Sequence, residues 1–347
     1  MWPAVMHERR AVMTRSAKGR IESGRVAGPA RPGEHSPGRD RSHSAPLRFA
    51  PEVRAALDAG TAVVALESTL ITHGLPFPRN HEVALAVEAE VRAAGAVPAT
   101  IAVLDGCIQV GLDAPTLDRL VHARDVAKLS RADLAVCLVR RGIGATTVAA
   151  TMICAQLAGI AVFATGGIGG VHRGAESSFD VSADLSELAQ TPVSVVAAGA
   201  KAILDLGKTL EVLETLGVPV IAVGQDAFPA FWSRDSGLRA PLRLDTPTEL
   251  AAAHRMRRAL GLPGGQLIAN PVPVPDEIPR AQIEPIIAVA LADAAAEGIA
   301  AKAVTPFLLR RIHELTGGRA LASNVALVRN NARLAAAVAI ALCAAAT

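Results

Sequence analysis

Short apolar runs alternate with longer helical patterns along most of the chain from residue 47 onward. Buried strands that alternate with helical stretches, such as 81–94 and 147–157, are typical of a parallel sheet with helical crossovers. The pattern therefore predicts an α/β fold. The runs that we expect to form strands are 62–66, 100–104, 134–139, 161–165, 193–197 and 218–223.

After residue 281 the pattern is mostly helical, and a long Ala-rich helix is expected over 324–342. No internal repeat or linker is evident, so a single α/β domain over residues 48–345 is predicted, with a mostly parallel central sheet flanked by helices and a helical C-terminal part. Residues 1–47 are rich in Arg, Ser, Gly, Pro and His and lack apolar periodicity, which predicts a disordered leader. A transit peptide is the alternative, although four acidic residues in this stretch argue against it.

Composition narrows the classes of function. The 35 basic and 32 acidic side chains give a net charge of only +3, and aromatic residues make up 3% of the chain, which argues against nucleic-acid binding. No uncharged apolar stretch reaches the roughly 18 to 20 residues of a membrane helix, so no membrane association is expected. The four cysteines lie in apolar runs without close pairing, which favours the cytoplasm.

Two residues that follow predicted strands could carry catalysis, because catalytic groups gather at the carboxyl ends of strands in open α/β sheets. Glu67 follows strand 62–66 and could act as a general acid in apolar surroundings, or it could be a structural acid. Lys201 follows strand 193–197. Burial favours the neutral amine of a lysine and so nucleophilic, Schiff-base chemistry, although a lysine at a helix start is often a structural cation.

Two other features suggest an anion site. Gly142 and Gly144 form a turn that leads through Thr146 and Thr147 into a helical pattern, and a helix start with free N–H groups attracts anions. From this turn alone, ordinary helix capping fits equally well. Lys128, in a basic turn before the predicted strand 134–139, could hold a phosphate or could simply be solvated.

The densest segment begins after strand 161–165, with four glycines in residues 166–170. Glycines there would let a ligand approach the backbone. Asp180, Ser182 and Asp184 then place oxygens at alternating positions, which suits a hard cation such as Mg²⁺ or Mn²⁺ held partly through waters. The alternative is that Ser182 or Asp184 caps a helix.

Taken together, these segments closely resemble the pseudouridine-5'-phosphate glycosidase family, which includes the indigoidine synthase A-like proteins. The likeness extends over nearly the whole chain outside the leader. The chain departs mildly from the residues that are common in the family at Leu75, Phe77, Ala145 and residues 177–179. The segments that carry the resemblance are 64–69, 72–74, 128–134, 146–152, 162–176, 180–185, 198–205 and 324–333.

The resemblance implies a reversible reaction in which water splits pseudouridine 5'-phosphate into uracil and ribose 5-phosphate. By similarity, Lys201 attacks C1' of the opened sugar and forms an imine, Glu67 donates a proton, and Asp180 binds one Mn²⁺ per subunit. The resemblance also implies a homotrimer, and the Ala-rich terminal helix would suit packing between subunits. Further residues expected to contact substrate are Lys128, Val148, Ser182, Ala183 and Asp184, and those expected to line the pocket are Thr147, Thr165, His172 and Asn324.

Two other functions remain open at this point. One is a different Schiff-base enzyme of the aldolase type that acts on a phosphosugar and also uses Lys201. The other is a non-catalytic protein that binds a sugar phosphate, against which the joint presence of Glu67, Asp180 and Lys201 argues. Dehydrogenase and kinase functions rank lower, because the glycines have neither dinucleotide nor Walker spacing.

Overall fold

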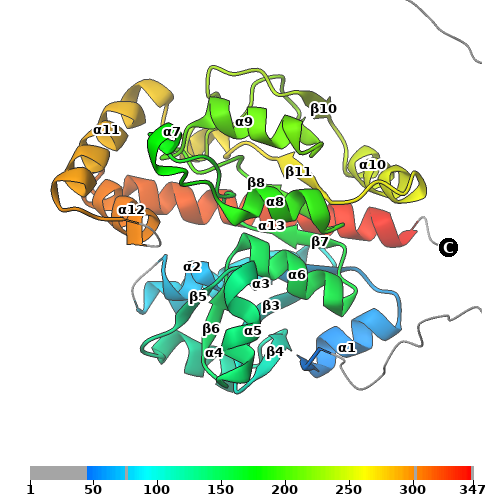
Figure 1. Ribbon diagram of the computed structural model, residues 1–347. Coiled ribbons are helices and arrows are strands. Elements are labelled where there is room, and N and C mark those ends of the chain that lie inside the picture. Colours follow the sequence, from blue (N-terminus) through cyan, green and yellow to red (C-terminus); the bar gives the residue numbers. More distant parts are fainter. Residues whose placement is uncertain (1–44, 75–76, 301–302, 345–347) are drawn as a thin grey trace, which may run out of the picture. The chain divides into compact units, whose positions relative to one another are not determined.

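The computed structural model describes residues 45–74, 77–300 and 303–344 (Figure 1). Residues from Ala45 onward form one compact unit, which contains a single 11-stranded sheet. The strands are β1 (Leu47–Phe49), β2 (Val63–Leu66), β3 (Val97–Leu104), β4 (Cys107–Val110), β5 (Ala127–Leu129), β6 (Gly144–Thr146), β7 (Val162–Ala164), β8 (Ser194–Ala197), β9 (Val220–Val223), β10 (Leu242–Leu244) and β11 (Gln266–Ala269).

The strands pair in the order β1-β4-β3-β2-β7-β8-β11-β9-β10, and β6 adds to β3 and to β5 away from this path. Every pair from β3 through β10 along this order is parallel. The antiparallel pairs are β3–β4 and β3–β6. The predicted, mostly parallel sheet is thus confirmed, and the segments that follow β2, β7 and β8 meet at one edge of the sheet.

Helices occupy most of the remaining described chain. They are α1 (Pro51–Asp58), α2 (Thr69–Thr72), α3 (Arg79–Ala93), α4 (Ala114–His122), α5 (Arg131–Val139), α6 (Val148–Ala158), α7 (Ala175–Ser178), α8 (Ala183–Gln190), α9 (Leu206–Thr215), α10 (Pro247–Ala259), α11 (Arg280–Ala296), α12 (Val304–Leu315) and α13 (Arg319–Ala344). A 3₁₀ turn at Val274–Asp276 precedes α11.

These helices cover both faces of the sheet. On one face α13, drawn in red in Figure 1, packs along β2, β7 and β8 with α3 and α10 beside it. On the other face α6 packs on β2 and β7 and contacts α5 and α8. Since α6 and α13 touch the same two strands from opposite sides, β2 and β7 are buried on both faces and consist of apolar residues.

The composition of α13 is explained by this position. Within the described residues it is the one helix long and apolar enough to cross a membrane. Its buried residues include the polar Asn331, which is fully enclosed and hydrogen-bonds to the backbone after β7. The Ala-rich helix therefore serves as a core helix of its own chain, so its composition no longer argues for packing between subunits.

One predicted strand is wrong. Residues 134–139 belong to helix α5, which begins after Ser130 with a capping box in which the Asp133 carboxylate accepts from the Ser130 N–H. An apolar run of this length fits a buried strand or a helix equally well, so periodicity could not decide. Leu134 and Cys137 are buried, whereas Val139 is exposed, as expected for one face of a helix.

The strand of this region lies earlier, at β5, so Lys128 is a strand residue and not part of a turn. The five other predicted strands and the helices over 81–94, 147–157 and 324–342 are confirmed with shifted ends. Most of the predicted leader, residues 1–44, lies outside the described residues. Its last residue, Leu47, already belongs to β1.

Candidate active site

A cavity of about 400 Å³ lies beyond the carboxyl ends of β2, β7 and β8. Glu67 follows β2, the glycine segment follows β7, and Lys201 follows β8 on the next turn. All the residues predicted to take part in catalysis or binding line this cavity except Thr165, which stands behind Glu67. Those that line it are Glu67, Lys128, Thr147, Val148, His172, Asp180, Ser182, Ala183, Asp184, Lys201 and Asn324.

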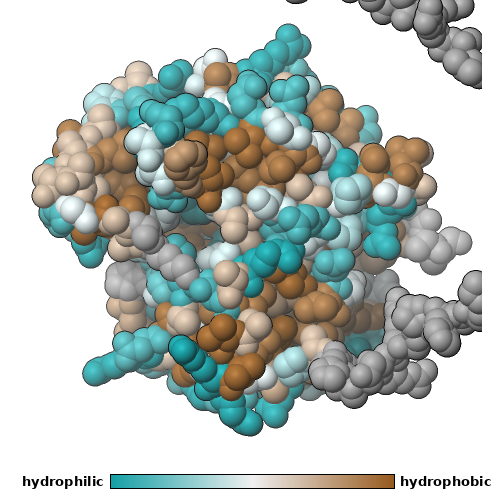
Figure 2. Space-filling view, viewed as in Figure 1, coloured by the Kyte–Doolittle hydropathy of each residue, from teal (hydrophilic) through white to brown (hydrophobic). Residues whose placement is uncertain are grey.

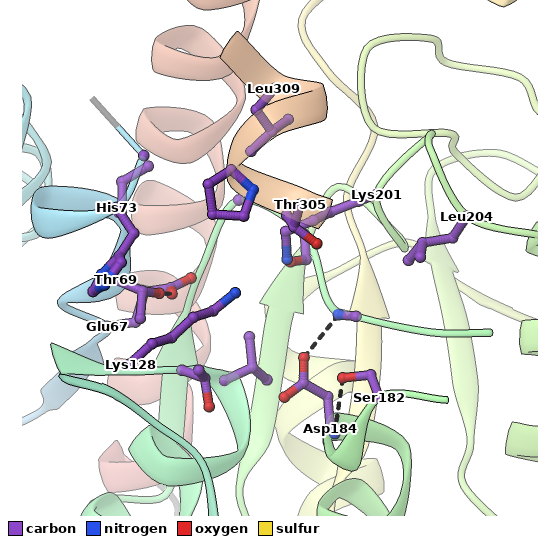
Figure 3. A pocket seen from close by; sticks show the side chains of 18 of the residues that line it. Glu67, Thr69, His73, Lys128, Ser182, Asp184, Lys201, Leu204, Thr305 and Leu309 are labelled. Atoms are coloured by element: carbon purple, nitrogen blue, oxygen red, sulfur yellow. Dashed lines mark hydrogen bonds between the residues drawn. The ribbon is translucent and has the colours of Figure 1, made fainter. Parts of the chain in front are cut away.

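The chemistry-bearing side chains approach the cavity from opposite sides (Figure 3). Glu67 comes from the β2 side, and Lys201 from the β8 side. Lys128 extends from β5 toward the space between them. Ser182 lies at one end of the view and Leu309 of α12 at the other. A ligand in this cavity would therefore lie between an acid and an amine.

The carboxylate of Glu67 is held by two hydroxyl groups. Thr69 donates to one of its oxygens and Thr165 donates to the other. Thr165 is fixed in turn, because its backbone N–H donates to the carbonyl of Val196 in β8 at 3.0 Å. The two hydroxyls orient the acid toward the cavity, so Thr165 acts through Glu67.

Ser68 links the acid segment to the start of α6. Its buried hydroxyl accepts from the N–H of Thr146 at 2.9 Å. The hydroxyl of Thr146 donates to the carbonyl of Ile101 at 2.8 Å and accepts from Thr151 at 2.9 Å. This enclosed network places Glu67 and the N-terminus of α6 in a fixed relation.

Lys201 is held at the end of its side chain, where Nζ donates to the carbonyl of Gly167 at 2.6 Å. Its approach depends on Gly199, which has a φ of +79° and would place a Cβ 2.3 Å from the carbonyl oxygen of Pro229. A side chain at residue 199 is therefore excluded. The loop can then pass close to residue 229 and bring the lysine to the cavity.

The glycine segment is packed more tightly than the sequence suggested. A Cβ on Gly169 would lie 2.2 Å from the hydroxyl oxygen of Ser182, and one on Gly170 would lie 2.4 Å from that of Thr209. We expected these glycines to let a ligand approach the backbone. For Gly169 and Gly170, the close approach is to side chains of the protein itself.

Asp184 ties two backbone segments together. Its carboxylate accepts from the N–H of Ala149 at 2.9 Å and from the N–H of Gly169 at 2.8 Å. The hydroxyl of Ser182 caps α8 by accepting from the N–H of Asp184 at 3.2 Å. The helix-capping alternative for Ser182 is therefore confirmed. Each carboxylate oxygen of Asp184 thus accepts from one amide, so this side chain bridges the start of α6 and the glycine segment.

The N-terminus of α6 keeps one amide for a ligand. Thr147 caps the helix, with its hydroxyl accepting from the N–H of Ala150 at 3.4 Å. Asp184 takes the N–H of Ala149. Within the described part of the chain, the N–H of Val148 is left as the first-turn donor without a partner. The predicted anion site thus consists of the Val148 N–H and the nearby Lys128, and both residues line the cavity.

Asp180 and His172 face each other at the cavity. The distance from His172 Nδ1 to Asp180 Oδ2 is 3.9 Å, and the Asp180 side chain is 42% exposed. Over the described ranges, no group of three or more His, Cys, Asp or Glu side chains is arranged to hold a metal ion. A cation at Asp180 would therefore be held by one carboxylate, with water or substrate supplying the other ligands.

Burial and two lysines lower the pKa values of the histidines at the cavity. Burial lowers the pKa of His172, and the nearby Lys201 and Lys128 lower it further, although Asp180 acts in the opposite direction. Burial and the charge of Lys128 also lower the pKa of His73. Burial and the neighbouring lysines thus favour the neutral form of both imidazoles.

Several cavity residues were missed from the sequence. Phe231 lines the cavity near Val328 of α13, His73 and Thr69 flank Glu67, and Leu309 closes one end from α12. An available signal was the aromatic cluster around Phe231 in a chain with 3% aromatic residues. The α12 residues gave no such signal, because an amphipathic helix does not reveal what its apolar face covers.

An acid and an amine that face one cavity at the carboxyl ends of parallel strands are the arrangement expected of an α/β enzyme. The chain belongs to the family of indigoidine synthase A like proteins, whose model matches residues 52–341. It is 70% identical over 297 residues to the pseudouridine-5'-phosphate glycosidase of Jannaschia sp. (strain CCS1), covering 86% of this chain and 98% of that one. The glycosidase of Roseobacter denitrificans is 68% identical, with 86% and 96% of the two chains covered.

Solved structures agree with this assignment. The crystal structure of the prealnumycin C-glycosynthase AlnA in complex with ribulose 5-phosphate has a TM-score of 0.80 and 39% identity, with 86% of this chain and 98% of that chain covered. An indigoidine synthase A-like protein from Thermotoga maritima has a TM-score of 0.79 and 32% identity, with 87% and 98% covered. The predicted family and fold are therefore confirmed.

Proposed function

We propose that this protein cleaves pseudouridine 5'-phosphate with water to give uracil and ribose 5-phosphate, and that it catalyses the reverse condensation. The observation that carries the proposal is the placement of Glu67 and Lys201 on opposite sides of one cavity (Figure 3). The names of relatives at up to 70% identity support the substrate. The phosphosugar bound to the C-glycosynthase neighbour supports the substrate class.

The bond to be broken explains why a lysine is needed. In pseudouridine the base is attached through carbon, so protonation of a nitrogen or oxygen atom cannot by itself release it. A covalent intermediate on C1' divides the difficult step into two easier ones. Lys201 is the nucleophile in this proposal.

The reaction begins with the phosphate near Lys128 and the Val148 N–H, where the nearby Ser182, Ala183 and Asp184 segment closes the site. The C1'–O4' bond of the sugar breaks with its electron pair on O4', Lys201 Nζ forms a bond to C1', and the proton that the nitrogen loses passes to O4'. The bond between C1' and the base then breaks, its electron pair passes to the base carbon, and Glu67 supplies the proton there. Water hydrolyses the resulting imine, which releases ribose 5-phosphate and restores the amine.

Lys201 must lose a proton before this attack. Its Nζ donates to the carbonyl of Gly167. A neutral amine can keep this donated bond while its lone pair points toward C1', so the contact with Gly167 holds the nucleophile in place. The two threonine hydroxyls likewise keep Glu67 in place.

We also propose that Asp180 anchors one Mn²⁺ per subunit. A carboxylate that lines the cavity and is 42% exposed suits a hard cation that keeps several waters. Mn²⁺ would supply positive charge for oxygens of the substrate. His172 lies beside Asp180, and we propose that it lines the same part of the pocket together with Thr147.

We further propose that the protein forms a homotrimer and that it is located in the cytoplasm. Exposed apolar side chains gather on α5 and α6, where Figure 2 shows a hydrophobic area. Val136 is 50%, Val139 84% and Leu157 49% exposed. Such a patch is typical of a surface that is covered in an assembly. Sedimentation equilibrium of the purified protein measures the subunit number, and a monomer would contradict this part of the proposal.

The decisive experiment is a product assay with pseudouridine 5'-phosphate, run with and without Mn²⁺. We expect uracil and ribose 5-phosphate with Mn²⁺ and the reverse condensation when both products are supplied. Lys201→Ala should abolish turnover and keep most of the substrate binding, while Asp180→Asn should remove the response to Mn²⁺. If the metal-loaded wild type neither cleaves nor condenses, the assignment is wrong.

The same assay decides between the remaining alternatives. An aldolase-type enzyme would also lose activity in Lys201→Ala and would also be trapped by borohydride, but it would release a carbon fragment of the sugar and no uracil. A sugar-phosphate sensor would bind ligand equally well with and without Lys201 and would turn nothing over. Identification of the released fragment therefore separates all three functions.

A further inference from the structure

Two aromatic residues stand next to each other at the cavity, although the chain holds only seven Phe, two Trp and no Tyr. Phe231 lines the cavity. Trp232 lies behind it and is fully buried. Their rings meet edge to face with a centroid distance of 5.0 Å. The indole of Trp232 reaches α13 and does not line the cavity.

We propose that Trp232 is a positioning residue that fixes the side-chain amide of Asn324 and thereby determines which base is accepted. Its indole Nε1 donates to Asn324 Oδ1 at 2.6 Å, and the carbonyl of Ala320 accepts from the same N–H at 3.1 Å. An indole N–H only donates, and so does the NH₂ group of asparagine. The oxygen of Asn324 must therefore face Trp232, and its NH₂ group is directed elsewhere.

The NH₂ group of Asn324 is available to a ligand. Asn324 lines the cavity together with Val325 and Val328, which lie on the same face of α13. Within the described ranges, Nδ2 has no hydrogen-bond partner. Phe231 and Leu309 add apolar surface around it. A planar, uncharged ring would find stacking surface here and one directed donor.

This inference rests on the proposed function, which places the base at this end of the cavity. The groups suited to phosphate, Lys128 and Ser182, lie away from Leu309 (Figure 3). Lys201 lies between the two ends, where C1' of the sugar must be. With the phosphate at one end and C1' in the middle, the base reaches Asn324.

A donor fixed in this way favours a carbonyl oxygen over an amino group. A ring carbonyl accepts from Nδ2, whereas an exocyclic amino group would set donor against donor. An unpaired buried donor then weakens binding by roughly tenfold or more. The arrangement therefore selects uracil against an analogue in which an amino group replaces the carbonyl that Asn324 contacts.

The test compares pseudouridine 5'-phosphate with two analogues, each carrying an amino group in place of one ring carbonyl. The wild type should prefer the natural substrate over at least one analogue by roughly tenfold in kcat/KM. Trp232→Phe removes the N–H, so the side-chain amide of Asn324 can rotate and exchange its oxygen and NH₂ positions. The preference for the natural substrate should therefore fall to within about threefold. Asn324→Asp keeps an acceptor for the indole and removes the donor, so the preference should vanish or reverse.

Phe228→Leu is the matched control, because Phe228 is a fully buried aromatic residue of the same segment that does not line the cavity. It should lower stability without changing the preference. The proposal is wrong if Trp232→Phe lowers kcat/KM equally for all three substrates. If Trp232→Phe does not fold, Asn324→Asp decides.

Calorimetry of uracil and its two amino analogues separates this inference from the proposed function. If the wild type binds uracil more tightly than an amino analogue but cleaves nothing, the function fails and the inference stands. If it cleaves pseudouridine 5'-phosphate and binds all three bases equally, the inference fails and the function stands.

Discussion

At the scale of single residues, Glu67 is the side chain whose orientation is fixed by the most defined set of hydrogen bonds. Glu67 receives two hydroxyl donors, one from its own turn and one from Thr165 after β7. Thr165 is nearly fully buried and makes no contact with the cavity. It should therefore affect the reaction through the orientation of Glu67 and have little influence on substrate binding.

Thr165→Val removes the hydroxyl and keeps the shape of the side chain. A hydrogen bond contributes about 0.5–1.5 kcal/mol, so we expect kcat to fall roughly 2- to 10-fold with KM nearly unchanged. Steady-state kinetics with pseudouridine 5'-phosphate measure this split. Thr191→Val is the control, because Thr191 donates to Glu187 outside the cavity. Equal losses in the two variants would mean that the effect is one of stability alone.

The sequence located Glu67 and Lys201, which line the cavity, but not their local partners. Glu67 and Lys201 could be found because polar residues directly after apolar strands are informative in a parallel sheet. The two hydrogen bonds that Asp184 accepts from the N–H groups of Ala149 and Gly169 could not be predicted from the sequence. They join segments whose spacing depends on how α6 packs. The same limit applies to Trp232 and its bond to Asn324.

At the scale of elements, helix α13 links the sheet to the active site. Asn331 on this helix is fully buried, and its Nδ2 donates to the carbonyl of Thr165 at 2.8 Å. Its Oδ1 accepts from Asn270, which follows β11, at 3.0 Å. One side chain thus joins α13 to the segments that follow two strands. Because one of these segments carries Thr165, the position of α13 also affects Glu67.

Asn331→Ala should therefore destabilise the protein strongly. It leaves buried groups on Thr165 and Asn270 without a partner, at about 1–3 kcal/mol each, so we expect a loss of about 2–5 kcal/mol in the free energy of unfolding. Urea denaturation measures it. Asn330→Ala is the matched neighbour, because Asn330 makes one half-buried bond to the carbonyl of Pro271 at 3.2 Å. A loss of the same size in both variants would contradict the assigned role.

Elements differed in how well the sequence predicted them. Central strands such as β2 and β7 were found because burial on both faces makes them continuously apolar. The run 134–139 was assigned wrongly because α5 is short and its apolar residues are contiguous. Strand β5, which carries Lys128, has three residues and only one buried position, so its pattern is too short to recognise.

At the scale of the whole molecule, a mostly parallel sheet covered on both faces must bury polar side chains where helices meet strands. His254 of α10 is such a residue, with 5% exposure, and its Nδ1 lies 2.9 Å from the hydroxyl of Ser194 in β8. Burial lowers its pKa to about 4, with Arg258, Arg257 and Arg255 adding repulsion. Among the described residues, nearby carboxylates do not raise the pKa of His254 to compensate for this lowering.

The direction of the resulting pH dependence follows from linkage. The pKa of His254 is about 6.5 in the unfolded chain and about 4 in the folded one, so the unfolded chain takes up the proton more readily. Its contribution is fully present above pH 6.5 and is lost as the pH falls toward 4. A shift of this size corresponds to a loss of about 3 kcal/mol in the free energy of unfolding.

His254→Gln can keep a hydrogen bond to Ser194 and cannot titrate. The variant should be less stable than the wild type at pH 7.5, and the difference should shrink by about 3 kcal/mol between pH 6.5 and pH 4. Urea denaturation at several pH values measures both curves. Carboxylates that titrate in this range affect the two proteins alike, so the difference between the curves isolates His254. Parallel curves would show that His254 takes up its proton as readily in the folded chain as in the unfolded one, so that the junction of α10 and β8 tolerates a buried charge.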